Sequence, residues 1–223
     1  SGMIERLLEM TPVFVQSLQE TVIMVGISLF ISTVIGIPLG TLLVITRPDH
    51  LLPSKAIYHT LNVVINIIRS LPFIILMVAI IPLTELIVGT SIGIKGAIVP
   101  LIFYTAPYIA RLMETALLEV DRGVIEAYQA MGASRSQIIF RIMIREARPG
   151  IVLCLTIATI GLIGATAMAG AVGAGGLGDL ALRYGYQQWD IEVMIVTVII
   201  LIIMVQAIQS LGNWAARKLK KNA

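Results

Sequence analysis

Residues 121–150 read DRGVIEAYQAMGASRSQIIFRIMIREARPG, and they are followed at once by a stretch, 151–172, that contains no charged residue. A helix of about 20 predominantly apolar residues is long enough to cross the hydrocarbon of a bilayer. The uncharged stretch is therefore expected to span a membrane. It holds the charged stretch, called the island below, at the membrane surface, where a polar pair of helices is suited to meet a soluble partner.

The overall composition agrees with a membrane protein. Apolar residues make up 57% of the 223 positions, charged residues make up 13%, and the mean hydropathy is +0.94. A soluble domain has about 25% charged residues. The single cysteine, Cys154, has no partner for an internal disulfide, and two histidines are too few for a convincing metal site. The net charge of +3 is better explained by membrane orientation than by nucleic acid, which is not an expected partner.

An all-α membrane protein with five transmembrane helices is predicted from the lengths of the apolar stretches. Prolines within the spans are tolerated where neighbouring helices satisfy the carbonyls they free, and Pro149 falls in a first helical turn, where proline is favourable. The five spans are expected at about 21–45, 57–81, 94–113, 151–172 and 191–211.

The distribution of lysine and arginine predicts that the amino terminus is outside and the carboxy terminus inside, because cytoplasmic loops are enriched in these residues. In this orientation the outside holds only Arg6, Lys95 and Arg183, and Arg69 lies within a span. The inside then holds Arg47, Lys55, Arg111, Arg122, Arg135, Arg141, Arg145, Arg148, Arg217, Lys218, Lys220 and Lys221. The chain divides into an extracytoplasmic segment 1–20, a transmembrane domain 21–211 with a cytoplasmic loop 114–150, and a basic cytoplasmic tail 212–223.

The second span carries a polar stripe. His59, Asn62, Asn66 and Arg69 recur at helical spacing, so they share one face, which should point to protein or water rather than lipid. One interpretation is a translocation path or a cytoplasmic gate, in which Arg69 could attract a substrate carboxylate. The other is a set of hydrogen bonds between helices, including bonds to carbonyls freed by Pro72.

Within the island, local rules predict two short helices. Gly132 is suited to end the first helix, about Arg122–Met131, in a left-handed conformation. Ser134 is suited to begin the second, with Gln137 completing a capping box. An ordinary interfacial hairpin would show the same pattern. A DNA-binding helix-turn-helix is disfavoured, because membrane spans on both sides would tether it to the bilayer.

The sequence has no phosphate-binding loop of the form G-x-x-x-x-G-K-[ST], and no Gly-Lys pair occurs in it. A pump built from this chain must therefore obtain its energy from another polypeptide. The island is the only sizeable cytoplasmic surface that the predicted topology offers for that contact.

The island resembles the loop of bacterial ABC-importer permeases that docks on the ATPase subunit. Glu126, Ala127 and Gly132, followed by Ala133-Ser134, match its E-A-x-x-x-x-G pattern, although this chain has Ile144-Arg145 where Leu-Pro is usual. Further stretches of the sequence resemble the methionine-importer branch of this family. They are Thr46-Arg47-Pro48, Asn66–Phe73, Gly89–Gly93, Gly170–Gly178 and Tyr184-Gly185-Tyr186.

This resemblance implies a type I ABC-importer permease fold with a cytoplasmic coupling-helix hairpin, in a multi-pass protein of the bacterial inner membrane. The chain would be a transport subunit without a cofactor of its own, and ATP and Mg²⁺ would bind to the partner ATPase. The implied partners are a second copy of the chain, two ATPase subunits, an extracytoplasmic substrate-binding (lipo)protein and methionine or a related small amino acid. The implied coupling residues are Glu126, Ala127, Met131, Gly132, Ala133 and Ser134.

The glycine-rich segment 170–178 contains a literal G-x-G-x-x-G, but an apolar helix rather than a strand precedes it, which argues against a dinucleotide site. Glycines here can break the end of the fourth span and let backbone line a central path, so Gly170 and Gly173 are path candidates. By resemblance to the methionine branch, Met168 is the candidate for a gate or a substrate contact. Packing is the alternative for this side chain.

Three other functions stay open at this level. The chain could carry another amino acid or a dipeptide, act as an ATP-independent channel or carrier, or serve as a membrane anchor for an ATPase without transporting anything. Five spans are few to enclose a path that opens to each side in turn, so a two-fold pair is expected.

Overall fold

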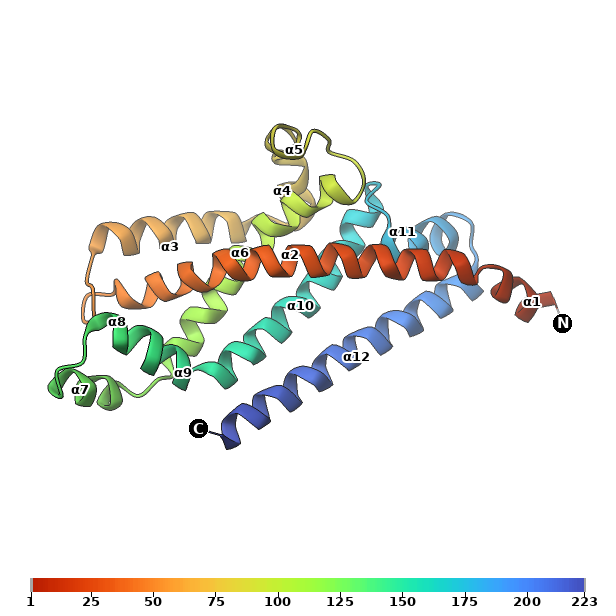
Figure 1. Ribbon diagram of the computed structural model, residues 1–223. Coiled ribbons are helices and arrows are strands. Elements are labelled where there is room, and N and C mark those ends of the chain that lie inside the picture. Colours follow the sequence, from red (N-terminus) through yellow and green to blue (C-terminus); the bar gives the residue numbers. More distant parts are fainter. Residues whose placement is uncertain (1, 223) are drawn as a thin grey trace.

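The computed structural model describes residues 2–222, and this part of the chain is helical with short connections. Figure 1 shows an elongated molecule in which the amino terminus lies at one end. The short helices α7 to α9 lie at the opposite end, called the hairpin end below, and α12 runs back toward it (Figure 1). The helices are α1 Gly2–Glu9, α2 Thr11–Ile45, α3 Lys55–Ser70, α4 Phe73–Ala79, α5 Ile81–Val88, α6 Gly93–Leu118, α7 Arg122–Ala130, α8 Arg135–Gln137, α9 Ile144–Glu146, α10 Arg148–Ala171, α11 Gly176–Leu180 and α12 Ile191–Lys221, with π-helical turns at Ile138–Met143 and Ala181–Gln187.

Four of these helices, α2, α6, α10 and α12, are long and apolar enough to cross a membrane. A fifth span is present if α3 and α4 are taken together, although they meet at a bend of 105°. Pro38, Pro100 and Pro107 lie inside helices and Pro149 lies in the first turn of α10, as the sequence predicts.

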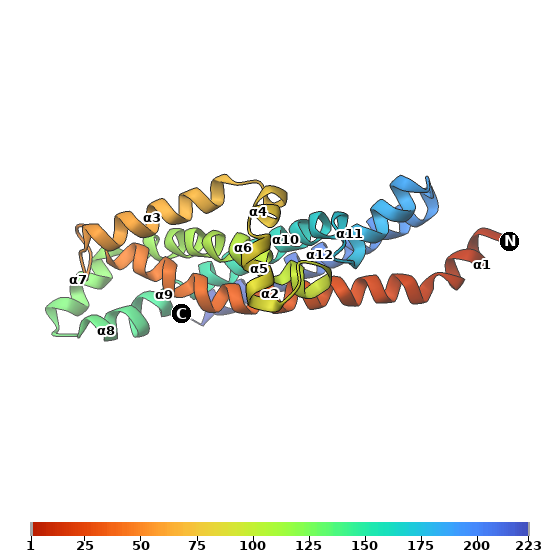
Figure 2. The same cartoon turned by 90° about the horizontal axis from the view of Figure 1, so that it is seen from above.

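The second predicted span, 57–81, is therefore not one continuous helix. Leu71 adopts an extended conformation, with φ −86° and ψ 131°, because the ring of the following Pro72 disfavours the helical region for it. The chain then turns into α4, and α5 occupies much of what was expected to be a loop at 82–93. In Figure 2, α4 and α5 lie across the directions of the longer helices.

The first and the last span, α2 and α12, are also longer than expected. Helix α2 begins at Thr11, so half of the predicted amino-terminal segment 1–20 belongs to it. Helix α12 continues to Lys221, so the predicted basic tail 212–223 is largely helical, with Lys218, Lys220 and Lys221 in its last turn. Cations at that end are favourable for the helix dipole, which explains the extension.

Helices α2 and α6 pack closely along their length. A Cβ at Gly40 would lie 2.5 Å from the Met113 Cβ and 2.6 Å from the Ala110 carbonyl oxygen, so only glycine lets the backbones approach this closely. Helix α10 lies beside α6 and also packs against α12. Helix α12 is the most exposed of the four, since only 11% of its apolar window is buried, and the remainder is free to face lipid or another chain.

Candidate functional site

The island folds into the two helices that its sequence predicts. Asp121 begins α7 by accepting a hydrogen bond from the Gly123 amide at 2.8 Å. The helix ends at Ala130, and Gly132 just beyond it has a φ of +83°. The Gly132 amide donates to the Gln129 carbonyl at 3.0 Å, and the Ala133 amide donates to the Tyr128 carbonyl at 3.0 Å. These two bonds form a Schellman motif, which confirms the predicted left-handed end.

The second helix begins with the predicted capping box. The Gln137 amide donates to Ser134 Oγ at 3.2 Å, and the Ser134 amide donates to Gln137 Oε1 at 3.0 Å. The helix continues through the π-helical turn into α9. Its inner side buries Ile138, Ile139 and Met143 in a core that also contains the ends of α2 and α6. The hairpin, defined here as residues 121–146, is thus rigidly seated on the spans.

The outer side of the hairpin collects the residues that were predicted to couple it to an ATPase. Glu126, Ala127, Gly132 and Ser134 are exposed, Ala133 is partly buried, and Met131 is 70% exposed. Phe140 is also exposed, at 67%, and sequence reasoning did not single it out. An aromatic residue within a polar island was the available signal. Met131 and Phe140 are thus two large apolar side chains left exposed on a polar hairpin, where a partner can cover them.

The loop between α2 and α3 supports the hairpin from the side. Arg122 Nη2 donates to the Asp49 carbonyl oxygen at 2.8 Å, and Leu51 is buried in the same core as Ile125 of α7. His50 lies in a small cavity of about 80 Å³ that Arg122 and Glu126 also line. Burial lowers the pKa of His50, and the nearby guanidinium groups of Arg122 and Arg47 lower it further.

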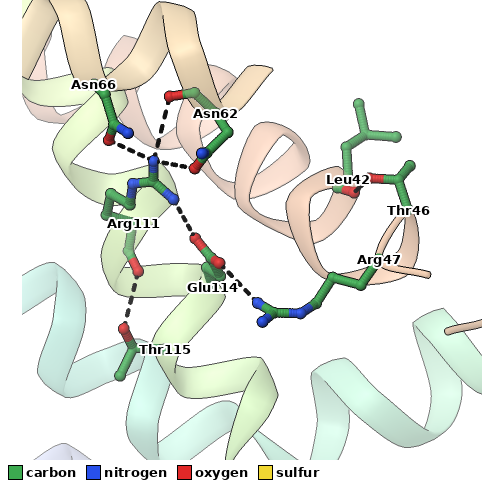
Figure 3. A network of polar contacts seen from close by, with 8 residues as sticks. All are labelled: Leu42, Thr46, Arg47, Asn62, Asn66, Arg111, Glu114 and Thr115. Carbon is green, nitrogen blue, oxygen red and sulfur yellow. Dashed lines mark hydrogen bonds and ion pairs between the residues drawn. The ribbon is translucent and has the colours of Figure 1, made fainter. Parts of the chain in front are cut away.

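A network of polar contacts joins α3, α6 and the segment after α2 near the hairpin end of the spans (Figure 3). Glu114 of α6 accepts from Arg47 Nη1 at 3.0 Å through Oε1 and from Arg111 Nη1 at 2.8 Å through Oε2. Arg111 Nη2 donates to Asn62 Oδ1 at 2.5 Å and to Asn66 Oδ1 at 2.6 Å, both on α3. We call these five residues the Glu114 network. Sequence reasoning missed Glu114, whose position three residues after Arg111 was the only hint.

The polar stripe of α3 is thereby divided between two environments. Asn62 and Asn66 make hydrogen bonds between helices, which is the second of the two interpretations of the stripe. His59 and Arg69 are exposed, and the Arg69 guanidinium lies 5.8 Å from the centroid of the Tyr108 ring. The structure therefore does not gather the four side chains into one pocket.

The glycine-rich segment interrupts the helix as predicted. Helix α10 ends at Ala171, and α11 begins at Gly176 after residues with positive φ at 173 and 175. Its start is held by α2: Glu20 Oε2 accepts from the Gly176 amide at 3.2 Å, and Thr21 Oγ1 accepts from the Leu177 amide at 2.9 Å. The two helices α10 and α11 are in close contact here, because a Cβ at Gly170 would lie 2.5 Å from the Asp179 amide nitrogen.

The candidate gate residue Met168 is 50% exposed on α10. The exposed positions around it, Gly164 and Val172, continue the same face of the helix, and Gly173 is exposed just beyond its end. The adjacent face of α10 is buried within the described chain at Ala169 and Gly170, so the face with Gly164 and Met168 is the open one. Among residues 2–222, no three side chains of the metal-ligating types lie together.

Comparison with known proteins adds to this geometry. The family described as "Binding-protein-dependent transport system inner membrane component" matches residues 36–221. The probable D-methionine transport system permease protein MetI of Vibrio cholerae is 49% identical over 199 residues, which are 89% of this chain and 88% of the relative. The methionine import system permease protein MetP of Bacillus subtilis is 44% identical over 172 residues, covering 77% and 78%.

A solved structure of the MetNI methionine ABC transporter in an inward-facing conformation contains a similar chain. The two chains superpose with a TM-score of 0.92 at 46% identity, over 95% of this chain and 98% of the other. The structure shows an exposed hairpin on a helical membrane domain, and the family match covers most of the sequence. Both observations agree with a transport-system membrane component. This chain belongs to the inner membrane components of binding-protein-dependent transport systems.

Proposed function

We propose that this chain is the permease subunit of an ATP-driven importer of methionine, and that the hairpin is where it receives the movement of a separate ATPase. The observation that carries the proposal is the outer side of the hairpin, where Glu126, Ala127 and Met131 are exposed while its inner side is buried against the spans. Similarity to permeases named for methionine transport supports the substrate.

The hairpin faces the cytoplasm in this proposal, so the amino terminus is outside and the carboxy terminus inside. The excess of basic residues on the hairpin side supports this orientation. ATP and Mg²⁺ bind to the ATPase, and this chain contributes only the docking surface formed by Glu126, Ala127 and residues 131–134. A short helix that lies in a groove of its partner transmits a displacement efficiently because it moves as one body.

Two copies of the chain and two ATPase subunits form the proposed assembly. One chain has four long apolar helices and one bent pair, which are few to enclose a path. The exposed face of α10 with Gly164 and Met168 offers a surface on which a second copy can approach closely. A substrate-binding (lipo)protein delivers methionine to the side opposite the hairpin.

The translocation path is proposed to run along this face of α10. Met168 supplies an adjustable thioether that can contact the thioether of the substrate. Gly170 and Gly173 shape the backbone at the outer end, and the exposed Arg69 of α3 gives the inner part of the path a polar side chain. Alternating access follows if hairpin displacement tilts the spans of the two copies against each other.

The test is methionine uptake by proteoliposomes that contain this chain with its ATPase and binding protein. Glu126→Arg should reduce ATP-dependent uptake at least about tenfold, since a reversed charge in a docking face costs on the order of 1.4 kcal/mol or more. Glu119→Arg makes the same change at an exposed position that precedes the hairpin and should transport normally. Normal uptake by the Glu126 variant would remove the hairpin from the mechanism. If unlabelled methionine does not compete with the uptake that is measured, the substrate is a different molecule.

A further inference from the structure

Among residues 2–222, Glu114 is the one anion whose ion pairs, with the bonds of Arg111 to α3, join three separate segments near the hairpin. Its two oxygens bind Arg47, which follows α2, and Arg111 of α6. Arg111 in turn holds Asn62 and Asn66 of α3, as Figure 3 shows. The Glu114 side chain is only 11% exposed. Without its charge, two guanidinium groups would face each other with no anion between them in the described chain.

Helix α3 has few other attachments at this level. Ile65 is its only buried residue. A small apolar cluster links it to Leu43 of α2 and Ala110 of α6, with Tyr58 and Leu61 at its margin. The five hydrogen bonds and ion pairs that run through Arg111 and Glu114, one of them to the Asn62 carbonyl oxygen, therefore form a large share of what fixes the orientation of α3. At its other end the chain bends at Leu71, so α3 is not continuous with α4.

The same network is connected to the hairpin. Arg47 lies in the loop whose next residues hold α7, through the bond from Arg122 to the Asp49 carbonyl oxygen and through buried Leu51. A displacement of α7 is therefore passed to the α2–α3 loop, from there to Arg47 and Glu114, and then through Arg111 to α3. Hydrogen-bonded ion pairs of this kind are directional, so they transmit rotation as well as translation.

We propose that Glu114 is a positioning residue of the transport cycle, which makes α3 follow the hairpin by holding Arg47 and Arg111 together. This inference rests on the proposed function of the hairpin and deepens it. Glu114 touches neither substrate nor nucleotide. Its role is to keep α3, with the polar residues on its exposed side, in step with the ATPase.

The decisive variant is Glu114→Gln in the complete transporter, compared with Glu119→Gln. Glu119 lies at the end of the same helix, is exposed, and makes no ion pair within residues 2–222. Glu114→Gln should leave assembly and ATP hydrolysis in place and lower methionine uptake per ATP hydrolysed about tenfold, within the range by which single residues alter coupling. Glu114→Asp keeps the charge and should recover most of the coupling. Equal coupling in the Glu114→Gln and Glu119→Gln variants would overturn the proposal.

A distance measurement separates positioning from simple stability. Spin labels at Ile67 of α3 and Leu118 of α6, both exposed, report the relation of the two helices in a Cys154→Ser background. The distribution should be narrow in the otherwise unchanged protein and broad in Glu114→Gln. If wild-type vesicles take up no methionine, the proposed function fails, but this distance still decides whether Glu114 positions α3.

A second variant covers the case in which Glu114→Gln does not assemble. Changing Asn62 and Asn66 together to Ala keeps both ion pairs of Glu114 and removes both side-chain bonds from Arg111 to α3, leaving only its 3.4 Å bond to the backbone carbonyl at position 62. The proposal expects the same broad distance and the same loss of coupling. A narrow distance with normal coupling would contradict it.

Discussion

Replacing Gly132 by Ala tests whether the shape of the hairpin turn is needed for docking. Gly132 has φ +83°, a conformation that residues with a Cβ adopt only at a cost. A Cβ built at this position meets no atom within 4 Å, so crowding contributes nothing. The whole effect must therefore come from the backbone conformation, which makes the expected magnitude unusually well defined.

The left-handed conformation costs an L-residue about 1–2 kcal/mol. The variant can accept this cost, or it can relax φ and lose the bonds from the Gly132 and Ala133 amides to Gln129 and Tyr128. Either way the turn is weakened by on the order of 1 kcal/mol, and opening becomes about five times more frequent. Asn tolerates the left-handed region better than Ala, so Gly132→Asn should show a smaller effect.

Hydrogen exchange followed by mass spectrometry measures this directly in the assembled transporter. The Ala133 amide, which is bonded to the Tyr128 carbonyl at 3.0 Å, should exchange about fivefold faster in Gly132→Ala than in wild type, with Gly132→Asn between them. Gly132→Pro removes the donor and forbids the positive φ, so it should also abolish ATP-coupled uptake. Equal exchange rates in wild type and Gly132→Ala would refute the reasoning.

Three further outcomes are expected. Gly40→Ala should lower the free energy of unfolding by about 1–3 kcal/mol, because the added Cβ crowds α6. Gly26→Ala on the same helix should not lower it, because a Cβ there meets nothing within 4 Å. Thermal melting in detergent compares the two variants. His50 has a lowered pKa, so below its ordinary value of 6.5 the unfolded chain binds more protons than the folded one, and stability should fall as pH falls from 6.5 toward the lowered pKa. His50→Gln should flatten that part of the pH profile. Met168→Ala should change the selectivity of transport or the ATP hydrolysis without substrate, and unchanged values of both would exclude it from the path.

Local rules predicted the hairpin well because its structure is decided by neighbours in sequence. Gly132 ends α7 and Ser134 with Gln137 begins α8, each through contacts within five residues. The resemblance to ABC-importer permeases rested on the same short stretch, whereas the methionine branch was suggested by further stretches between Thr46 and Tyr186. The lengths of α2 and α12 were underestimated because polar residues at a membrane boundary continue a helix as readily as they end one.

Two features could not be predicted from the sequence, the bend at Leu71 and the Glu114 network, and the reasons differ. Proline occurs inside α6 at Pro100 and Pro107 without breaking it, so Pro72 alone did not reveal where a break would fall. Glu114 and Arg111 read as a common pair on one helix, and their partners come from positions about 45 and 67 residues away. Only the packing of α2 and α3 on α6 brings those groups together.

In the proposed cycle, helix α2 transmits a displacement of the hairpin from one end of the fold to the other. At the hairpin end it packs on α6 through Gly40 and leads directly to Arg47, and at the other end Glu20 and Thr21 hold the start of α11. One helix of 35 residues thus grips the fold at both ends. In the proposed cycle, a displacement of α7 carries α2, α6 and the α10–α11 junction together, because α2 is held by contacts at both of its ends. Met168 lies close to that junction, so the displacement that begins at the hairpin reaches the outer part of the proposed path in the same movement.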